Sequence, residues 1–385
     1  MTACIIGWAH SPFGKLANED IESLIVRAAT DAIADAGLAP ADIDEIYIGT
    51  MGIFVRQEFP SSLALQVDPA MRFKPATHVE NACATGSAAI HQGLNAIAAK
   101  RARHVLVVGA EKMTASSEVN DILIRASYLK EEGEIEGGFA GVFGRIAQMY
   151  FQRYGDKSDA LARIAAKNHR NGAQNPLAQI QKDLGYEFCR TVSDKNPLVA
   201  GPLRRTDCSL VSDGAAALVL TDVDTALKAK KAIVFRAAEQ VNDFLPISKR
   251  DILAFEGPEL AWRRAMASAQ VTLEDISFAE VHDCFTIAEL LVYEAIGLTP
   301  KGEGERAINE GWSEKTGKLP INPSGGLKSK GHPIGATGVS MHVLSAMQLT
   351  GTAGGIQVKD ASLAGIFNMG GAAVANYASI LERLR

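Results

Sequence analysis

The same order of sequence patterns occurs twice in this chain, and this repetition limits the folds available to it. An alanine-rich helical pattern, a short turn and an apolar run follow one another at 28–49 and again at 261–283. A glycine-rich turn that opens an alanine-rich helix also occurs twice, around Gly86 and around Gly338. Helical patterns that alternate with short β-rich runs are typical of βαβ units and a mostly parallel sheet. Two such sets in tandem predict a duplicated α/β fold with two βαβ-rich halves.

One long segment interrupts the first copy. In the second copy a strand-like run at 363–368 leads directly into another at 370–377, whereas roughly 100 residues separate the corresponding runs of the first copy. A segment of this length between core strands usually carries function, and a dimerisation arm is the alternative. We therefore predict an N-terminal half at 1–113 and 213–230, an inserted cap at 114–212 and a C-terminal half at 231–385.

The composition excludes several classes of protein. Hydrophobic residues make up 47% of the 385 residues, enough for large buried cores, which excludes a disordered chain. The net charge of −5 lacks the basic character of a nucleic-acid-binding protein. No apolar run is long enough to span a membrane, and the N-terminus lacks the pattern of a signal peptide. The five cysteines form no CxxC pair, which argues for a reducing compartment and against a disulfide or zinc framework, so we expect a cytoplasmic protein.

Cys83 is the first candidate for chemistry. It stands in ENACATGSAA, directly before a predicted helix, where the positive end of the helix dipole favours a thiolate. The small residues beside it allow a substrate to approach the backbone. A buried, inert cysteine is the alternative, and a reactive cysteine needs a base.

His332, in the glycine-rich stretch SKGHPIGATG, is the candidate base for Cys83. The loops of these two residues occupy equivalent places in the two halves, so we expect them to face one another. A loop-stabilising histidine is the alternative interpretation.

A third cluster, VHDCF at 281–285, stands at the end of the predicted strand FAEVHD of the second half. His282, Asp283 and Cys284 thus follow the carboxyl end of a strand, where parallel sheets hold their sites. Adjacent residues of a strand point to opposite faces, which excludes a metal site within the cluster. Cys284 is a candidate general acid or base, whereas we expect Asp283 to pair with a cation or to cap a helix.

Many of the 35 glycines gather at a few turns. They stand around Gly86, at 335–338, and in the pairs 325–326 and 370–371. Backbone N–H groups in FNMGGAA at 367–373 are suited to an oxyanion hole. We therefore expect these glycines to mark the places where the backbone comes close to a substrate.

NACATGSAA, HDCF and GHPIGATG, in this order and in register with the duplication, resemble the thiolase superfamily over essentially the whole chain. HDCF, in place of the Asn-Glu-Ala-Phe block of most thiolases, is similar to the sterol-carrier-protein type, here without the fused lipid-carrier domain of some members. The resemblance implies mixed five-stranded sheets packed in an αβαβα layering, with a cap that holds coenzyme A. It also implies a homodimer or a dimer of dimers, a coenzyme A thioester as substrate, and no metal or redox cofactor.

The resemblance assigns the two thiols. Cys83 is expected to be the nucleophile that accepts the acyl group, with His332 as the group that activates it. Most thiolases carry a second cysteine in a Cys-x-Gly motif, which here reads Asn368-Met369-Gly370. As in the sterol-carrier type, Cys284 of HDCF is expected to replace that missing thiol.

The resemblance also implies two oxyanion sites. His282 and His332 are expected to form the first, and the N–H groups of Cys83 and Gly370 the second. Donors of this kind are needed because cleavage of a 3-ketoacyl thioester releases an enolate, which preorganised hydrogen bonds stabilise.

The resemblance therefore implies an acyl-CoA C-acyltransferase of lipid metabolism, of the acetyl-CoA C-acetyltransferase or 3-ketoacyl-CoA thiolase type. Such an enzyme cleaves a 3-ketoacyl-CoA with coenzyme A, or condenses acetyl-CoA in reverse, through an acyl-cysteine. Two alternatives stay open. One is other C–C chemistry, either acyl transfer to an acceptor other than coenzyme A or retro-aldol cleavage of a CoA-linked side chain. The other is a subunit that depends on an accessory partner.

Overall fold

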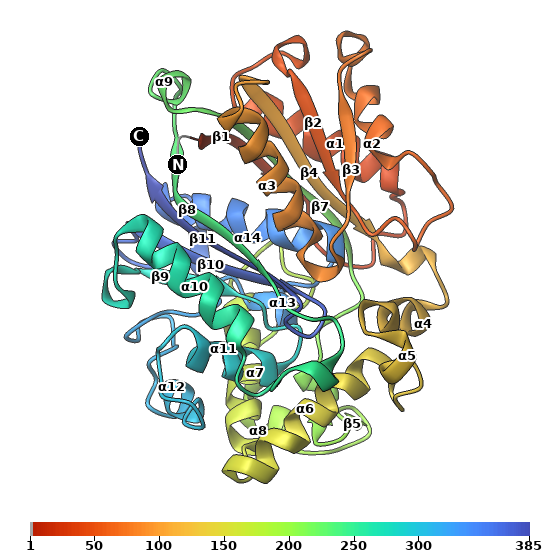
Figure 1. Ribbon diagram of the computed structural model, residues 1–385, viewed down its shortest axis with the longest axis vertical. Coiled ribbons are helices and arrows are strands. Elements are labelled where there is room, and N and C mark those ends of the chain that lie inside the picture. Colours follow the sequence, from red (N-terminus) through yellow and green to blue (C-terminus); the bar gives the residue numbers. More distant parts are fainter. Residues whose placement is uncertain (1–2) are drawn as a thin grey trace.

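The computed structural model describes residues 3–385, so the first two residues of the predicted N-terminal half lie outside the described part. Figure 1 shows two groups of strands, one at the upper right and the other crossing the middle of the molecule toward the left. The N-terminal group has five strands: β1 (Ala3–His10), β2 (Glu45–Gly49), β3 (Ala76–Val79), β4 (His104–Lys112) and β7 (Asp213–Asp222). The C-terminal group has four: β8 (Ile233–Asn242), β9 (Phe278–Val281), β10 (Leu363–Gly370) and β11 (Ala375–Arg383).

The strand pairing is that of a duplicated α/β fold with mixed sheets. β2 is parallel to β3 and β4, and β7 runs antiparallel to β4 and β1. In the second group β9 is parallel to β10, and β11 runs antiparallel to β10 and β8. The groups join where β1 pairs with β8 over only two residue pairs, which gives the order β3-β2-β4-β7-β1-β8-β11-β10-β9. The predicted fold class is confirmed.

The C-terminal group differs from the prediction in one respect, because it has four strands and not five. The fifth place, beside β9, holds an isolated bridge in which Ile321 pairs in parallel with Ala279. Pro320 before the bridge has no N–H, and Asn322 after it has a φ of 53°. Neither residue fits a continued strand, so the pairing ends after one residue.

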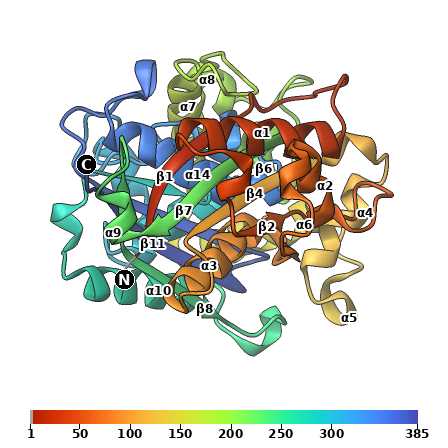
Figure 2. The ribbon, with the colours of Figure 1, turned by 90° about the horizontal axis from the view of Figure 1, so that it is seen from above.

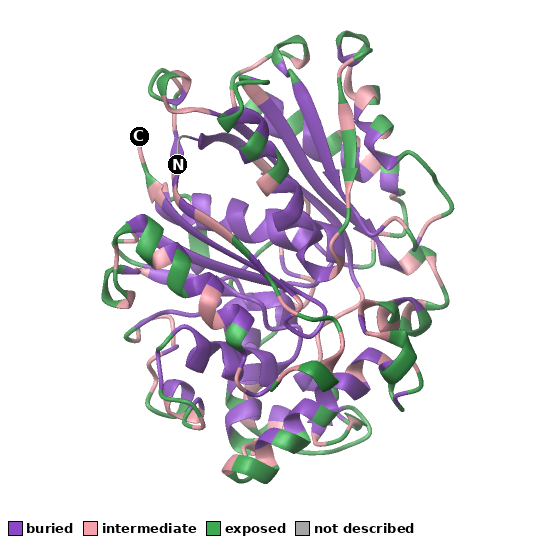
Figure 3. Ribbon diagram, viewed as in Figure 1, coloured by how far each residue is buried: buried purple, intermediate pink, exposed green. Residues whose placement is uncertain are grey.

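Helices and sheets alternate in five layers, as predicted. α1 (Ile21–Asp35) covers the outer face of the first sheet, and α10 (Glu256–Ala269) with α11 (Thr286–Ala295) covers that of the second. Between the sheets lie α3 (Thr85–Ala98) and α14 (Ile334–Leu349). Figure 2 shows α1 and α3 on opposite sides of β2 and β4. α14 is buried on nearly all sides, as Figure 3 shows, because a sheet lies on either side of it.

Two glycines allow α3 and α14 to pack closely. A Cβ on Gly86 would lie 2.7 Å from the backbone nitrogen of Val339, and one on Gly338 would lie 2.3 Å from that of Ser87. We predicted that these glycines bring the backbone close to a substrate, and for this pair the prediction is wrong. The backbone that they approach belongs to the neighbouring helix.

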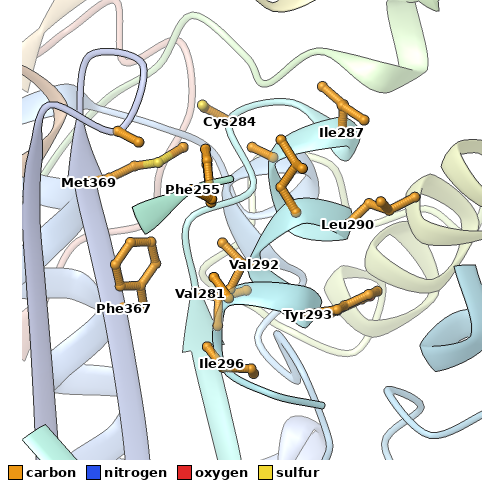
Figure 4. Close-up of a cluster of buried hydrophobic side chains, with 14 of the residues drawn as sticks. Phe255, Val281, Cys284, Ile287, Leu290, Val292, Tyr293, Ile296, Phe367 and Met369 are labelled. Atoms are coloured by element: carbon orange, nitrogen blue, oxygen red, sulfur yellow. The ribbon is translucent and has the colours of Figure 1, made fainter. Parts of the chain in front are cut away.

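The inserted segment lies between β4 and β7 in the chain and folds against the C-terminal half. Its elements are α4 (Val119–Leu123), α5 (Leu129–Glu132), α6 (Gly138–Tyr154), α7 (Ser158–Gly172), α8 (Gly185–Arg190), β5 (Leu198–Ala200) and β6 (Leu203–Arg204). Side chains of α6 and α7 share one hydrophobic cluster with α10, α11 and β10. Figure 4 shows part of this cluster, including Cys284 at its margin. The predicted boundaries of the three parts stay predictions.

Four short helices complete the fold. They are α2 (Pro60–Leu63), α9 (Val223–Ala226), α12 (Glu305–Asn309) and α13 (Gly326–Ser329). Among the helices within residues 3–385, none combines the length and the apolar character needed to cross a bilayer.

Candidate active site

Cys83 lies at the entrance to α3, on a tight turn. The chain leaves β3, makes a short 3-10 turn at Ala82–Ala84 and continues into α3. Ala82 has a φ of 49°, an unfavourable value for a residue with a Cβ, so the surrounding structure must hold the turn in place. The turn leaves Cys83 only 4% exposed, at the wall of a cavity.

This cavity, of about 180 Å³, brings together residues from three distant segments. Cys83, Cys284 and His332 all line it. The sulfur of Cys83 and one ring nitrogen each of His282 and His332 lie within 4.8 Å of one another. Within residues 3–385, these three residues are also the one group with ligand atoms close enough to hold a metal ion. The structure thus places the two equivalent loops face to face, as the duplication predicts.

His332 keeps one ring nitrogen available. Its Nδ1 lies 2.6 Å from the hydroxyl of Thr337, and that hydroxyl donates to the carbonyl oxygen of Pro333 at 3.0 Å. Because the hydroxyl has a single hydrogen, Nδ1 must donate to it, which leaves a lone pair on Nε2. Nε2 is buried and has no hydrogen-bond partner among the described residues, so it is free to accept a proton.

His282 follows β9, and its ring contacts Asn368, to which the motifs assign no role in the site. Its Nδ1 lies 2.9 Å from the amide nitrogen of Asn368 on β10, and its Nε2 is buried without a partner in the described chain. The rings of His282 and His332 meet edge to face, with centroids 5.2 Å apart. In the sequence, Asn368 marked only the place of an absent cysteine, and no motif indicated its contact with a histidine.

Asp283 ties the HDCF block to its surroundings and is not part of the cavity wall. Its carboxylate accepts from the backbone N–H of Leu327 at 2.7 Å and of Lys328 at 3.2 Å, in the first turn of α13. It also accepts from the side chain of Asn168 on α7 at 2.8 Å. The prediction that Asp283 caps a helix is confirmed. Gly326 belongs to this contact, since a Cβ there would lie 2.3 Å from the carboxylate, so its predicted closeness to a substrate is wrong.

Cys284 and its neighbour Cys208 add two more thiols to the cavity wall. Cys284 is 2% exposed, and its carbonyl oxygen accepts from the backbone N–H of Ser209 at 2.8 Å. This bond fixes the tail of the inserted segment against the HDCF block. We did not predict Cys208, because it stands in the insert outside any motif.

Burial keeps the reactive groups in their uncharged forms. Burial raises the pKa of the Cys83 thiol to about 12, against the opposing hydrogen bonds from backbone N–H groups. It also raises the pKa of Cys284 well above its usual value. Burial lowers the pKa of His332 to about 3 and that of His282 well below its usual value. We predicted that the helix dipole would favour a thiolate at Cys83, which is wrong for the free protein because desolvation has the larger effect.

Gly370 and Gly371 lie against the turn of Cys83. A Cβ on Gly370 would be 2.5 Å from the carbonyl oxygen of Asn81, so only glycine fits there. The backbone of Gly371 acts to lower the pKa of the Cys83 thiol, although burial outweighs it. The predicted closeness of this pair to a substrate and the oxyanion role of Gly370 and Cys83 stay predictions.

A second cavity, of about 310 Å³, opens in the inserted segment. Residues of α6, of β5 and of the turn that follows β5 line it, and Val199 lines both cavities. Arg145 is the only cationic side chain among the described residues of its wall. The sequence alone had assigned no residue of the cap to ligand binding.

Comparisons with known proteins show which family this chain is similar to. The family model for the thiolase N-terminal domain matches residues 3–185, and that for the thiolase C-terminal domain-like region matches residues 239–383. An acetyl-CoA acetyltransferase of Methanothermobacter thermautotrophicus is 36% identical over 371 residues, which cover 95% of this chain and 96% of the relative. Sterol carrier protein 2 of Homo sapiens is 32% identical over 390 residues, covering 95% of this chain and 69% of that protein.

Solved structures match the fold over its whole length. The structure described as "Ltp2-ChsH2(DUF35) aldolase" has a TM-score of 0.84 at 22% identity and covers 100% of this chain and 98% of that one. An acetyl-CoA acetyltransferase from Syntrophomonas wolfei has a TM-score of 0.75 at 20% identity, with 99% of each chain covered. At these identities the structural matches establish the fold alone.

Proposed function

The chain belongs to the thiolase family and is a transferase of the thiolase type, and we propose that it acts as an acyl-CoA C-acyltransferase through an acyl-cysteine. In this proposal it cleaves 3-ketoacyl-CoA with coenzyme A, or condenses acetyl-CoA in the reverse direction. The observation that carries the proposal is that Cys83, Cys284 and His332 line one small cavity, with a ring nitrogen of His282 within 4.8 Å of the Cys83 sulfur.

The first half of the reaction forms the acyl-cysteine. Nε2 of His332 accepts the proton of the Cys83 thiol as the sulfur attacks the 3-keto carbon. This timing suits the uncharged resting state, because the thiolate forms only as the new bond forms. Preorganised hydrogen-bond donors stabilise the negative charge on the former ketone oxygen, and the backbone N–H groups beside Cys83 are suited to this role.

Cleavage of the C–C bond then releases an enolate, whose carbon needs a proton. Cys284 lines the same cavity, and its raised pKa keeps it protonated, so it is suited to donate that proton. The products at this point are acetyl-CoA and an acyl group on Cys83. In the second half, coenzyme A attacks the acyl-cysteine and its thiol proton passes to Cys284, while the released Cys83 sulfur takes back the proton held on Nε2 of His332.

The size of the cavity supports a short acyl group. Its volume of about 180 Å³ lies below the range of roughly 300–1,000 Å³ that is usual for ligand pockets. Bulky side chains, among them Met113, Phe139 and Phe285, line it. The names of the archaeal relatives, acetyl-CoA acetyltransferases, support the same preference.

The second cavity is proposed to take part of the coenzyme A that carries the acyl group. It adjoins the first cavity at Val199, and Arg145 offers a charge for a phosphate group. A homodimer or dimer of dimers is also proposed. β3 ends the described sheet, and an unpaired edge of this kind can pair with a second copy. A cytoplasmic location and a role in lipid metabolism stay predictions.

Aldol cleavage of a CoA-linked side chain is the second candidate. The structural match to a protein described as an aldolase favours it. The name of that match has two parts, so this alternative includes an accessory subunit on which the enzyme would depend. The presence of both Cys83 and Cys284 in the cavity favours thiolysis, because two thiols serve acyl transfer and proton transfer separately.

The proposal is tested by a screen of 3-ketoacyl-CoA thiolysis, from acetoacetyl-CoA upward, in the presence of coenzyme A. We expect the highest kcat/KM for the shortest substrates and no turnover by Cys83→Ala. Cys189→Ala is the matched control, because Cys189 is equally buried but lies in a separate cluster of the insert. Absence of thiolysis with every substrate, or activity retained in Cys83→Ala, would contradict the proposal.

A further inference from the structure

His282 and His332 have different hydrogen-bond partners behind their rings. Both have a buried Nε2 without a partner among the described residues. Nδ1 of His332 hydrogen-bonds to the hydroxyl of Thr337, whereas Nδ1 of His282 hydrogen-bonds to the side-chain amide of Asn368. The difference decides where each ring carries its hydrogen, and so what each ring can do.

Three contacts fix the orientation of the Asn368 amide. Its nitrogen lies 3.1 Å from the carbonyl oxygen of Cys83 and 2.9 Å from Nδ1 of His282. Its oxygen accepts from the hydroxyl of Ser87 at 2.8 Å. A carbonyl oxygen only accepts, so the atom that faces Cys83 must be the NH2 nitrogen and not the amide oxygen.

The second hydrogen of that NH2 group therefore faces Nδ1 of His282. Nδ1 must accept it, which places the hydrogen of the neutral ring on Nε2. In His332 the assignment is the reverse, with the hydrogen on Nδ1 and the lone pair on Nε2. One ring thus offers a proton acceptor, and the other offers a hydrogen-bond donor.

The same assignment acts against metal binding. A thiol and two histidines whose ligand atoms lie within 4.8 Å of one another are a suitable set for Zn²⁺ or Co²⁺. Since the Asn368 amide occupies Nδ1 of His282, ligation must use Nε2, which requires a lone pair there and so a hydrogen on Nδ1. That hydrogen would point at the N–H of Asn368, which is repulsive.

We propose that Asn368 is a positioning residue that holds His282 in its Nε2–H form, which makes the ring an oxyanion donor and keeps Cys83, His282 and His332 from closing on a divalent cation. The oxyanion part rests on the proposed function. The tautomer and the exclusion of metal do not, and they are tested without turnover.

The first test is ¹⁵N NMR of the imidazole nitrogens in the full-length protein, with signals assigned by His282→Gln and His332→Gln. We expect His282 to be protonated on Nε2 and His332 on Nδ1. A wild-type His282 that is protonated on Nδ1 would overturn the proposal.

The second test replaces the donor by an acceptor. In Asn368→Asp the carboxylate accepts from Nδ1–H, so Nε2 of His282 gains a lone pair. We expect the variant to bind Co²⁺ about 10- to 100-fold more tightly than the wild type, with a thiolate-to-cobalt absorption band. Asn368→Ala removes the donor without adding a charge and should give an intermediate affinity. Asn376→Asp is the matched control, since Asn376 is equally buried on the adjacent strand but makes no contact with His282.

Activity separates a positioning role from a general loss of structure. We expect Asn368→Asp to lower kcat about 10²- to 10³-fold, the usual effect of removing one oxyanion donor. Chelation of the added metal should not restore the activity, because the donor is still absent. Equal Co²⁺ affinities in the wild type, Asn368→Asp and Asn368→Ala would overturn the proposal. If the wild type shows no thiolysis, the proposed function fails, while the NMR and Co²⁺ measurements still decide this inference.

Discussion

Gly338→Ala tests whether the close packing of α3 against α14 supports the active site. The new Cβ would lie 2.3 Å from the backbone nitrogen of Ser87, 2.5 Å from its hydroxyl oxygen and 2.7 Å from the amide oxygen of Asn368. An ordinary contact needs about 3.5 Å, so the two helices must separate by about 1 Å. Overpacking of a core costs about 1–3 kcal/mol, and the rigid backbone neighbour here places the expected value near 3 kcal/mol.

This free energy converts into a measurable change in Tm. At about 2.1 cal/mol/K per residue, the 385 residues have an unfolding entropy of about 0.8 kcal/mol/K, so Tm should fall by about 4 °C. The displaced Ser87 and Asn368 should also lower kcat about 100-fold, the usual effect of a 1 Å misplacement. Differential scanning calorimetry and acetoacetyl-CoA thiolysis measure the two effects. Gly14→Ala is the control, because its Cβ would contact only Leu16, at 3.9 Å. Equal Tm and kcat in both variants would refute the packing argument.

Three further predictions concern the reaction. Cys284→Ala should abolish C–C cleavage but leave acylation of Cys83 by acetyl-CoA mostly intact, and equal thiolysis rates in this variant and the wild type would disprove the two-thiol mechanism. Arg145→Ala should raise KM for coenzyme A with little change in kcat, as steady-state kinetics would show, and an unchanged KM would place the coenzyme elsewhere. The rate of Cys83 acylation by acetyl-CoA should be constant from pH 6 to 9. The pKa values of His332, about 3, and of Cys83, about 12, lie outside this window, so one protonation state of the pair dominates throughout. In single-turnover measurements, an inflection between pH 6 and 9 would show that one of these groups titrates there.

Much of the fold follows from patterns within short windows of sequence. The alternation of helical and strand-like runs and its repetition predict the two sheets and the helices between them. The strand count fails at Ile321, because a proline before it and a left-handed residue after it stop the pairing. Glycine patterns are ambiguous in the same way. Gly86 packs against the backbone of α14 and Gly370 packs against the turn that holds Cys83, yet both stand in similar glycine-rich stretches.

The site residues that stand within a single sequence motif are predictable from the sequence. Cys83, His332 and Cys284 each stand in a recognisable block, and the duplication indicates that the first two loops meet. Asn368 is not predictable in this way, because its role depends on β10 placing it between Cys83 and His282, which are far apart in sequence. The direction of the Cys83 pKa shift also depends on burial, which the local sequence does not reveal.

The central claim is that Cys83 carries the acyl group, and mass spectrometry of the acid-quenched protein after incubation with acetyl-CoA tests it most directly. The account predicts one added acetyl group in the wild type and in Cys284→Ala, located on the peptide that contains Cys83, and none in Cys83→Ala. An acetyl group on Cys284 or Cys208, or one that persists in Cys83→Ala, would contradict it.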